Sequence, residues 1–378
     1  MPDSNVRRHI ERTLQHGDFQ SDQPRAIIPR TQCRMDNFSD ALILNQACNL
    51  RSEPLMDGIM LLPRKTVGGL PHEDLRACVD GTMCETLHYG RYWHGGTFLT
   101  RILLVFADFQ SIRFILYILS SILMMLCGVT LWRRVGWVCP VAILLSLLFS
   151  YLFVMQFSVQ LSMVLLVALA GVMAVAHGSN PLVTLFIVGS ATAYLDLLTA
   201  PMLTLGLPLV ALVELKSDDP FRHKTKTISL TTLMWVIGYG ATWGIKWVIA
   251  SLFTHENVVA DGMSNLLNRS SALDGVSRWQ SVLANVELLP WKYIVALLVV
   301  MSLLAMIFRR AGGWKKSLPY LPLVLIPYVW YFFAANHSYL HCWFTFRAQA
   351  VSLSAIILAF ASLVDWQRVA HFFKISDQ

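Results

Sequence analysis

The chain has 378 residues, of which 55% are hydrophobic and only 14% are charged. Soluble domains carry roughly 45–50% apolar and about 25% charged residues, so this composition excludes an ordinary soluble protein. The net charge of +7 does not indicate a nucleic-acid partner, because many basic residues lie in short segments between apolar runs. We therefore expect an all-α, polytopic helical membrane protein whose partners include membrane lipids and no nucleic acid.

Residues 1–111 form a polar segment that contains no spanning helix and no signal peptide. We expect it to be extracytoplasmic and of mixed structure, with helices around 38–50 and 73–87 and a loop at 63–71. Because nothing here carries the segment across a membrane, either a first spanning helix is missing ahead of it or the segment lies on the other side, and we favour the missing helix.

Four cysteines fall in this segment: Cys33, Cys48, Cys78 and Cys84. If the segment is extracytoplasmic, they form up to two disulfides, and the sequence leaves all three connectivities open.

Residues 112–378 form the predicted transmembrane domain, since a spanning helix needs about 20 mostly apolar residues. About nine apolar runs are candidates: 112–132, 136–154, 158–176, 181–199, 201–214, 227–253, 292–308, 318–335 and 347–365. The fifth run is short and begins at Pro201, which favours half of a broken helix or a re-entrant segment buried by protein.

Basic residues follow the first, fifth, seventh and ninth runs: Arg133, Arg134, Lys216, Arg222, Lys224, Lys226, Arg309, Arg310, Lys315, Lys316, Arg368 and Lys374. With nine spans, all four connections lie on one side, which must be cytoplasmic. The N-terminal segment, the loop 254–291 and the link 335–347 then share the opposite side.

An acidic motif, residues 34–40, carries Asp36 and Asp40 four residues apart. On a helix this spacing puts both carboxylates on one face, where they could act as a general base or bind a metal. The alternative is structural, with Asp36 as the N-cap of the helix that follows.

Arg91 and His94 lie in an aromatic segment shortly before the first apolar run. Aromatic residues are typical of the membrane interface, so anchoring alone explains their neighbours. Arg91 and His94 additionally suit phosphate binding and proton relay.

The link 335–347 is dense in polar side chains and contains His337, His341 and Arg347. Two histidines alone would leave a metal ion with too few ligands, so we favour binding of a phosphate or a sugar.

Asp196 and Lys246 are charged residues inside predicted spans. Such residues are costly in lipid and indicate function by default. A structural ion pair between them, or the extension of Lys246 to the interface, is the alternative.

The acidic motif, the His/Arg-rich outer links and the short cytoplasmic connections resemble the GT-C class of membrane glycosyltransferases. The likeness is closest to uncharacterised bacterial membrane proteins linked to surface polysaccharides, in the segments MDNFSDALILNQA (35–47), YGRYWHGGTFLTRILL (89–104) and ANHSYLHCWFTFR (335–347). Members of the class begin with a spanning helix that this chain lacks.

This resemblance implies inverting transfer of a sugar from a polyprenyl-phosphate-linked donor to a glycan or lipid acceptor of the cell envelope. It makes Asp36 the catalytic base, with Asp40 second. Arg91, His94, His337, His341 and Arg347 would face the lipid phosphate or the sugar. It also implies a multi-pass protein of the cell membrane, namely the bacterial plasma membrane.

Two other functions stay open. Asp196, Lys246 and the segment at Pro201 suit a transporter or flippase of a lipid-linked or small polar substrate. A non-catalytic protein of polysaccharide assembly is the third hypothesis. The sequence fixes no cofactor and leaves a divalent metal open.

Overall fold

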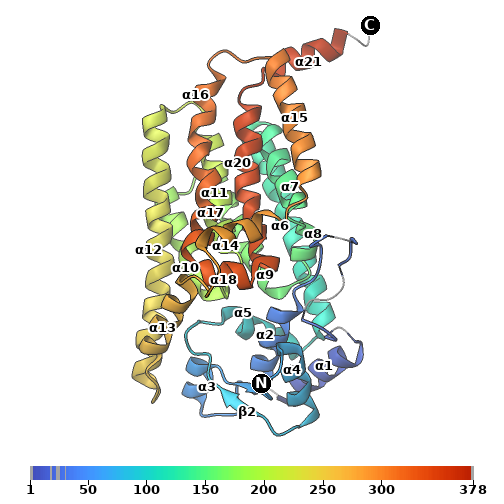
Figure 1. The fold of residues 1–378 in the computed structure, drawn as a ribbon, viewed down its shortest axis with the longest axis vertical. Helices are drawn as coiled ribbons and strands as arrows, with labels where there is room; N and C mark the ends of the chain where they lie inside the picture. Colours follow the sequence, from blue (N-terminus) through green and yellow to red (C-terminus); the bar gives the residue numbers. More distant parts are fainter. Residues whose placement is uncertain (1–2, 18, 23–25, 30, 376–378) are drawn as a thin grey trace.

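The computed structural model describes residues 3–17, 19–22, 26–29 and 31–375. The regular secondary structure of these residues is almost all helical, and it includes one antiparallel pair of short strands, β1 (Arg64–Thr66) and β2 (Glu85–Leu87). Long helices run side by side along the molecule, with the N-terminal helices gathered at one end and the C-terminus at the other (Figure 1). The prediction of a helical protein is therefore confirmed.

The N-terminal part folds as a small unit of helices around the strand pair. Its elements besides β1 and β2 are α1 (Asp3–Gln15), α2 (Asn37–Asn49), α3 (Leu55–Leu61), α4 (Pro71–Asp80) and α5 (Gly95–Leu104). The helix predicted at 38–50 is confirmed as α2. The helix predicted at 73–87 is wrong in its second half, because Gly81 ends α4 with a φ of 78° and residues 85–87 form β2.

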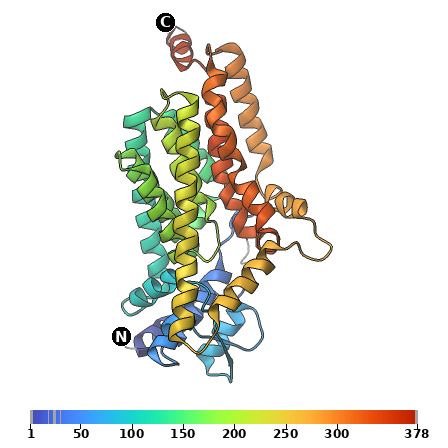
Figure 2. The same cartoon turned by 90° about the vertical axis from the view of Figure 1, so that its left-hand side faces the viewer.

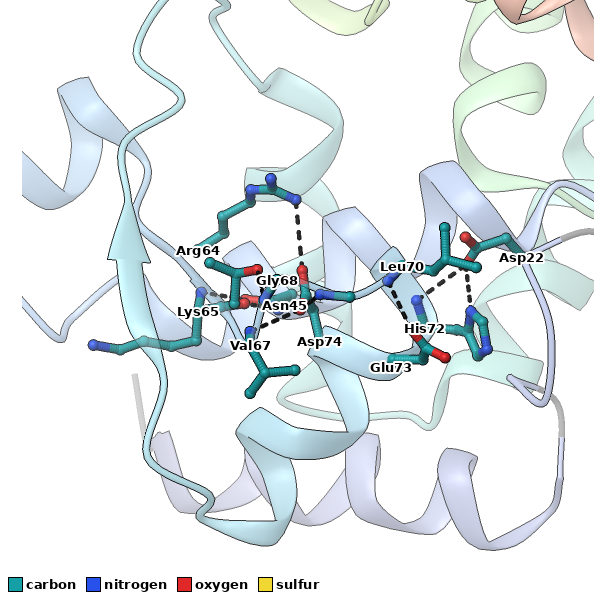
Figure 3. Close-up of polar contacts among 12 residues, drawn as sticks. Asp22, Asn45, Arg64, Lys65, Val67, Gly68, Leu70, His72, Glu73 and Asp74 are labelled. Carbon is teal, nitrogen blue, oxygen red and sulfur yellow. Dashed lines mark hydrogen bonds and ion pairs between the residues drawn. The ribbon is translucent and has the colours of Figure 1, made fainter.

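Backbone-to-side-chain hydrogen bonds join α2, β1 and α4 (Figure 3). The Asn45 side chain of α2 donates to the Lys65 carbonyl at 2.8 Å and accepts from the Lys65 N–H at 2.9 Å. The Asp74 carboxylate of α4 accepts from the Val67 N–H at 2.9 Å. Because these part-buried bonds connect α2 and α4 to β1 and the residue that follows it, they hold the N-terminal part together.

Four described helical segments are long and apolar enough to cross a membrane: α6 (Phe109–Val135), α9 (Val159–Ala176), α12 (Phe221–Phe253) and Cys342–Ala361. The last segment joins α19 (Cys342–Thr345), η2 (Phe346–Gln349) and α20 (Ala350–Ala361). A fifth span results if α14 (Arg278–Val286) and α15 (Trp291–Ile307), which meet at 79°, count as one.

The other apolar runs form shorter helices: α7 (Val138–Phe149), α8 (Leu152–Met155), α10 (Pro181–Leu195), α11 (Met202–Leu215), η1 (Leu318–Tyr320) and α17 (Leu321–Phe333). Helix length therefore supports a membrane protein but does not confirm nine spans. The short α11 begins after Pro201, and every residue from Met202 to Val213 is buried. This burial allows a short helix at membrane depth, because protein rather than lipid surrounds it.

Helices α10 and α12 pack closely because each contributes a glycine to the contact. A Cβ atom at Gly189 would lie 2.3 Å from the Trp235 carbonyl oxygen, and one at Gly238 would lie 2.2 Å from the Phe186 carbonyl oxygen. Small residues at such positions let membrane helices approach to backbone contact. This pair forms one wall of the bundle that carries the site described below.

The polar segments separate to the two ends of the bundle. Helix α12 extends to the end that holds the N-terminal helices, where α13 (Val258–Ser270) follows it (Figure 2). Helix α18 (Ala335–Leu340) also lies toward that end, whereas α16 (Gly313–Ser317) and α21 (Trp366–Ile375) lie at the opposite one (Figure 1). Segments predicted to share a side are thus close in space.

Candidate functional site

A cavity of about 440 Å³ lies among α12, α13, α17, α18 and the segment before α5. Its walls are mostly aromatic and aliphatic: Tyr92, Leu198, Tyr239, Trp243, Trp247, Leu266, Trp330, Phe333 and Ala334. Its polar lining consists of Arg91, Asn265, Arg269, Ser270 and His337. A largely apolar pocket with a few convergent polar groups is the usual form of a small-ligand site.

Two arginines line this cavity, and one of them has a carboxylate partner. The Arg91 guanidinium lies 4.2 Å from the centre of the Tyr89 ring, and its Nη1 atom is 3.2 Å from the Asp261 carboxylate. The Arg269 Nη1 atom is 2.5 Å from His337 Nδ1. Asp261 and Arg269 both belong to α13. This helix therefore pairs with Arg91 through Asp261 and contacts His337 through Arg269.

His337 is held as a neutral imidazole in one tautomer. Its Nε2 atom is 2.7 Å from the Leu198 carbonyl oxygen and must donate there, so Nδ1 accepts from Arg269. Burial, together with the charges of His341 and Arg269, lowers the pKa of His337 well below its usual 6.5.

The turn that receives His337 is shaped by Asp196. The Asp196 carboxylate accepts from the Thr199 N–H at 2.8 Å and from the Gln160 side chain at 3.3 Å. Leu198 lies between Asp196 and Thr199 in the chain. Its φ of 67° is a left-handed conformation that is costly for this residue type. Asp196 therefore acts on the cavity through the backbone, and it does not line it.

Five buried atoms of cavity-lining residues have no hydrogen-bond partner among the described residues. They are Arg91 Nε, Tyr239 Oη, Trp243 Nε1, Arg269 Nε and Trp330 Nε1. All five can donate, and buried donors in proteins are nearly always satisfied. Five such donors around one cationic cavity fit a ligand that is rich in acceptor oxygens and negatively charged.

Two glycines open the α12 wall of the cavity. Gly240 and Gly244 lie one turn apart and both line it, and a Cβ atom at either position would meet nothing within 4 Å. The space that side chains would fill is thus left beside Trp243 and Trp247. The cavity combines an apolar groove with a cationic end.

Asp36 is completely buried and caps α2, so the structural alternative for this residue is confirmed. Its Oδ1 atom accepts from the Ser39 N–H at 2.9 Å, whereas Oδ2 has no partner among the described residues. Burial, and then the charge of Asp40, raises the pKa of Asp36 to about 7. The positive charge of Arg347 opposes this shift.

Arg347 is fully buried and donates to the carbonyl oxygens of Trp343 at 3.0 Å and Arg34 at 3.2 Å. The second donation joins the link 335–347 to the acidic motif. The structure thus brings Asp36 and Arg347 into one electrostatic environment, but neither residue lines the cavity.

Asp40 forms a buried ion pair with Arg113 of α6 at 2.8 Å and accepts from the Val159 N–H of α9 at 3.0 Å. These contacts leave Asp40 engaged on two sides. Its observed role is to fasten α2 to the bundle.

His94 is buried and His341 is half-buried beside the cavity, and neither lines it. The His341 ring lies 4.9 Å from that of His337 and 5.7 Å from that of Phe38, and burial lowers its pKa to about 4. His94 Nε2 is 2.8 Å from the Tyr89 carbonyl oxygen, and burial lowers the pKa of His94 to about 3. Both are neutral aromatic packing residues in this conformation.

Lys246 does not pair with Asp196, so that expectation is wrong. Its Nζ atom donates to the Met60 carbonyl at 2.8 Å and lies 5.4 Å from the centre of the Trp93 ring. The reason is that Lys246 faces the N-terminal part, where the Met60 carbonyl lies in the last turn of α3. Lys246 therefore links α3 to α12.

Sequence reasoning missed Arg269, Asp261 and the aromatic face of α12. The signal was present as a four-residue period, because Tyr239, Trp243 and Trp247 alternate with Gly240 and Gly244 along one predicted span. Arg269 gave no comparable signal, because α13 meets the link 335–347 only in the folded chain.

Within the described ranges, no group of three or more His, Cys, Asp or Glu side chains is arranged to hold a metal ion. No protein-family model, curated protein or solved structure matches this chain.

Proposed function

We propose that the protein is a membrane glycosyltransferase that moves a sugar from a polyprenyl-phosphate donor to a glycan or lipid acceptor of the cell envelope. The observation that carries this proposal is the cavity, in which unpartnered donors and two arginines adjoin a groove of aromatic and aliphatic side chains. A lipid phosphate has matching parts, namely an anionic group rich in acceptors and an apolar chain.

In this proposal Arg91 and Arg269 bind the donor phosphate. Arginine suits phosphate because its fixed fork of donors pairs with two oxygens at once. The phosphate gains negative charge as it leaves the sugar, so the same two groups stabilise the transition state more than the ground state. The polyprenyl chain then lies along Gly240 and Gly244 on α12.

Asp36 is the proposed base. Its Oδ2 atom is without a partner, and a pKa of about 7 is suited to accepting a proton near neutral pH. Phe38, two residues after Asp36, contacts His341, which contacts His337 on the cavity wall, so ring contacts connect the acidic motif to the phosphate site. Because Asp36 is fully buried, this role requires the segment before α2 to move and admit the acceptor hydroxyl.

The proposal includes nine spans in the cell membrane, with the N-terminal part and the loop 254–291 on the extracytoplasmic side. The arrangement of α1–α5 and α13 at one end and of α16 and α21 at the other supports it (Figure 1). Lys315 and Lys316 in α16 are the basic residues that favour a cytoplasmic position there.

The test is transfer of radiolabelled sugar from polyprenyl-phosphate donors by the purified chain in nanodiscs, with donor binding measured on the same samples. We expect Asp36→Asn to bind donor and lose transfer, and Arg269→Ala to weaken donor binding and reduce transfer. Arg222→Ala, which removes an exposed arginine near the start of α12, is the matched control. Transfer that survives in Asp36→Asn would exclude this base.

A second candidate is a flippase or assembly protein for the same lipid-linked substrate. It is favoured by the lining itself, because none of the described lining residues carries a carboxylate. Donor binding by the wild type without any transfer, together with movement of fluorescent lipid-linked sugar across liposomes, would support transport. Binding without transfer or movement would support assembly.

A further inference from the structure

A second cavity, of about 540 Å³, lies in the N-terminal part and is lined by three thiols. Cys48, Cys78 and Cys84 line it together with the basic side chains of Arg7 and Lys65. All three cysteines are free and only partly buried. None of these residues takes part in the proposed lipid-phosphate site.

Cys48 and Cys78 line the same cavity from neighbouring helices. Cys48 lies in the last turn of α2 and Cys78 in the last turn of α4, and each thiol shifts the pKa of the other. The Asn49 side chain donates a hydrogen bond to Cys78 Sγ at 3.2 Å. The bonds that brace α2, β1 and α4 fix the helices that carry this pair (Figure 3).

The surroundings distinguish the two sulfurs. The Cys48 thiol, followed by the hydrogen bond from Asn49 and the charges of Arg7 and Lys65, outweighs burial and lowers the pKa of Cys78 to about 6. The Cys78 thiol, with burial, raises the pKa of Cys48 well above its usual range. One thiolate beside one protonated thiol is the arrangement of an attacking and a resolving cysteine.

We propose that Cys78 and Cys48 form a redox-active dithiol that exchanges with external disulfides and closes to a disulfide between α2 and α4. The Cys78 thiolate attacks one sulfur of a partner disulfide, forms a mixed disulfide and releases the first partner thiolate. Cys48 gives its proton to that thiolate and attacks Cys78 Sγ, which releases the second. The Cys78 thiolate and the Cys48 thiol are thereby oxidised to a disulfide, and the partner disulfide is reduced to one thiol and one thiolate, which takes a proton from water.

A metal site is the competing interpretation of three clustered thiols. The geometry excludes it for the described residues, since no three His, Cys, Asp or Glu side chains are arranged around a common position. Cys84 points elsewhere and donates to the Thr82 carbonyl at 3.2 Å. It therefore serves as a built-in control, because it shares the cavity without contacting the reactive pair.

The experiment treats the full chain in nanodiscs with oxidised glutathione, alkylates the remaining thiols and maps disulfide-linked peptides by mass spectrometry. We expect a Cys48–Cys78 link in the wild type and in Cys84→Ser. We expect Cys48→Ser to stop at the mixed disulfide and carry one glutathione on Cys78. Cys78→Ser should form neither product.

A link from Cys78 to Cys84, or unchanged alkylation of all three thiols, would overturn the proposal. Peptide mapping of the wild type decides this even if a variant fails to fold. Alkylation rates add a second measurement, because a thiol with a pKa near 6 is about 90% thiolate at pH 7, against a few per cent for an ordinary cysteine. Alkylation of Cys78 in the reduced chain no faster than that of Cys84 would likewise contradict it.

Discussion

The cavity and the acidic motif differ in how completely their polar groups are satisfied. Around the cavity, five buried donors of lining residues have no partner among the described residues, and the wall at Gly240 and Gly244 is open. In the acidic motif, Asp40 is fully engaged by Arg113 and Val159, and Asp36 keeps one oxygen without a partner. The cavity has donors that a ligand can satisfy, whereas most polar groups of the acidic motif already have partners inside the protein.

This difference separates recognition from chemistry in the proposed mechanism. Incomplete satisfaction is expected where a ligand completes the hydrogen bonds, and it is costly elsewhere in a protein interior. The two aspartates of the acidic motif also differ, because only Asp36 keeps a carboxylate oxygen that could accept a proton. The predictions below test that division, starting from the largest expected effect.

Replacing Asp40 by Ala should destabilise the protein by about 3–5 kcal/mol, because Arg113 would be left buried without its counter-charge. The measurement is thermal unfolding in detergent. The double variant Asp40→Ala with Arg113→Met should recover part of the loss, since it leaves no isolated charge. Equal losses in the single and double variants would contradict the ion-pair role.

Asp36 should make stability depend on pH. Its pKa rises from 3.8 to about 7 in the folded chain, so its contribution is complete below pH 3.8 and disappears as pH rises through about 7. The contribution of Asp36 to the free energy of unfolding changes by at most about 4 kcal/mol between these pH values. Asp36→Asn keeps an oxygen for the Ser39 cap and should flatten the dependence between pH 4 and 7. Parallel profiles for wild type and variant would disprove the raised pKa.

Replacing Arg269 by Ala should weaken binding of polyprenyl phosphate by about 10–100-fold, the usual worth of a charged hydrogen bond. Binding by isothermal titration in nanodiscs measures this effect. Arg222→Ala should leave the affinity unchanged. An equal loss in both variants would show that the membrane-surface charge, rather than the cavity, attracts the lipid.

Gly244→Leu should reduce the same affinity by about tenfold, because the side chain enters the space meant for the apolar part of the ligand. Gly128→Leu on α6 is the matched control, since a Cβ there also meets nothing within 4 Å. Unchanged affinity in Gly244→Leu would place the lipid outside the groove.

The smallest expected effect concerns His88, which contacts Glu53 at 2.8 Å and also Glu256. Although burial lowers its pKa, the two glutamates raise it above 6.5 overall. Its stabilising contribution is therefore complete below pH 6.5 and is lost as pH rises through the raised value. His88→Gln should cost about 1 kcal/mol at pH 6 and less at pH 9, as measured by thermal unfolding. A cost independent of pH would rule out the charged pairs.

Much of the fold could be predicted from the sequence. The apolar runs gave the helices, and the capping chemistry of Asp36 gave the start of α2, because both depend on nearby residues. The helix predicted at 73–87 is too long because Gly81 ends α4, and this local signal was overlooked. The number of spans could not be derived from the sequence, because several apolar runs fold into helices that are shorter than a membrane is thick.

The sequence by itself determined a helical membrane protein, with its polar residues gathered in a few segments at the ends of apolar runs. Only the tertiary structure decided which of those residues meet. Arg91 joins Arg269 through α13, Lys246 joins α3 rather than Asp196, and Cys48 joins Cys78. The physical reason is that hydropathy and helix caps act within a few residues, whereas a site forms where segments far apart in the chain pack against one another.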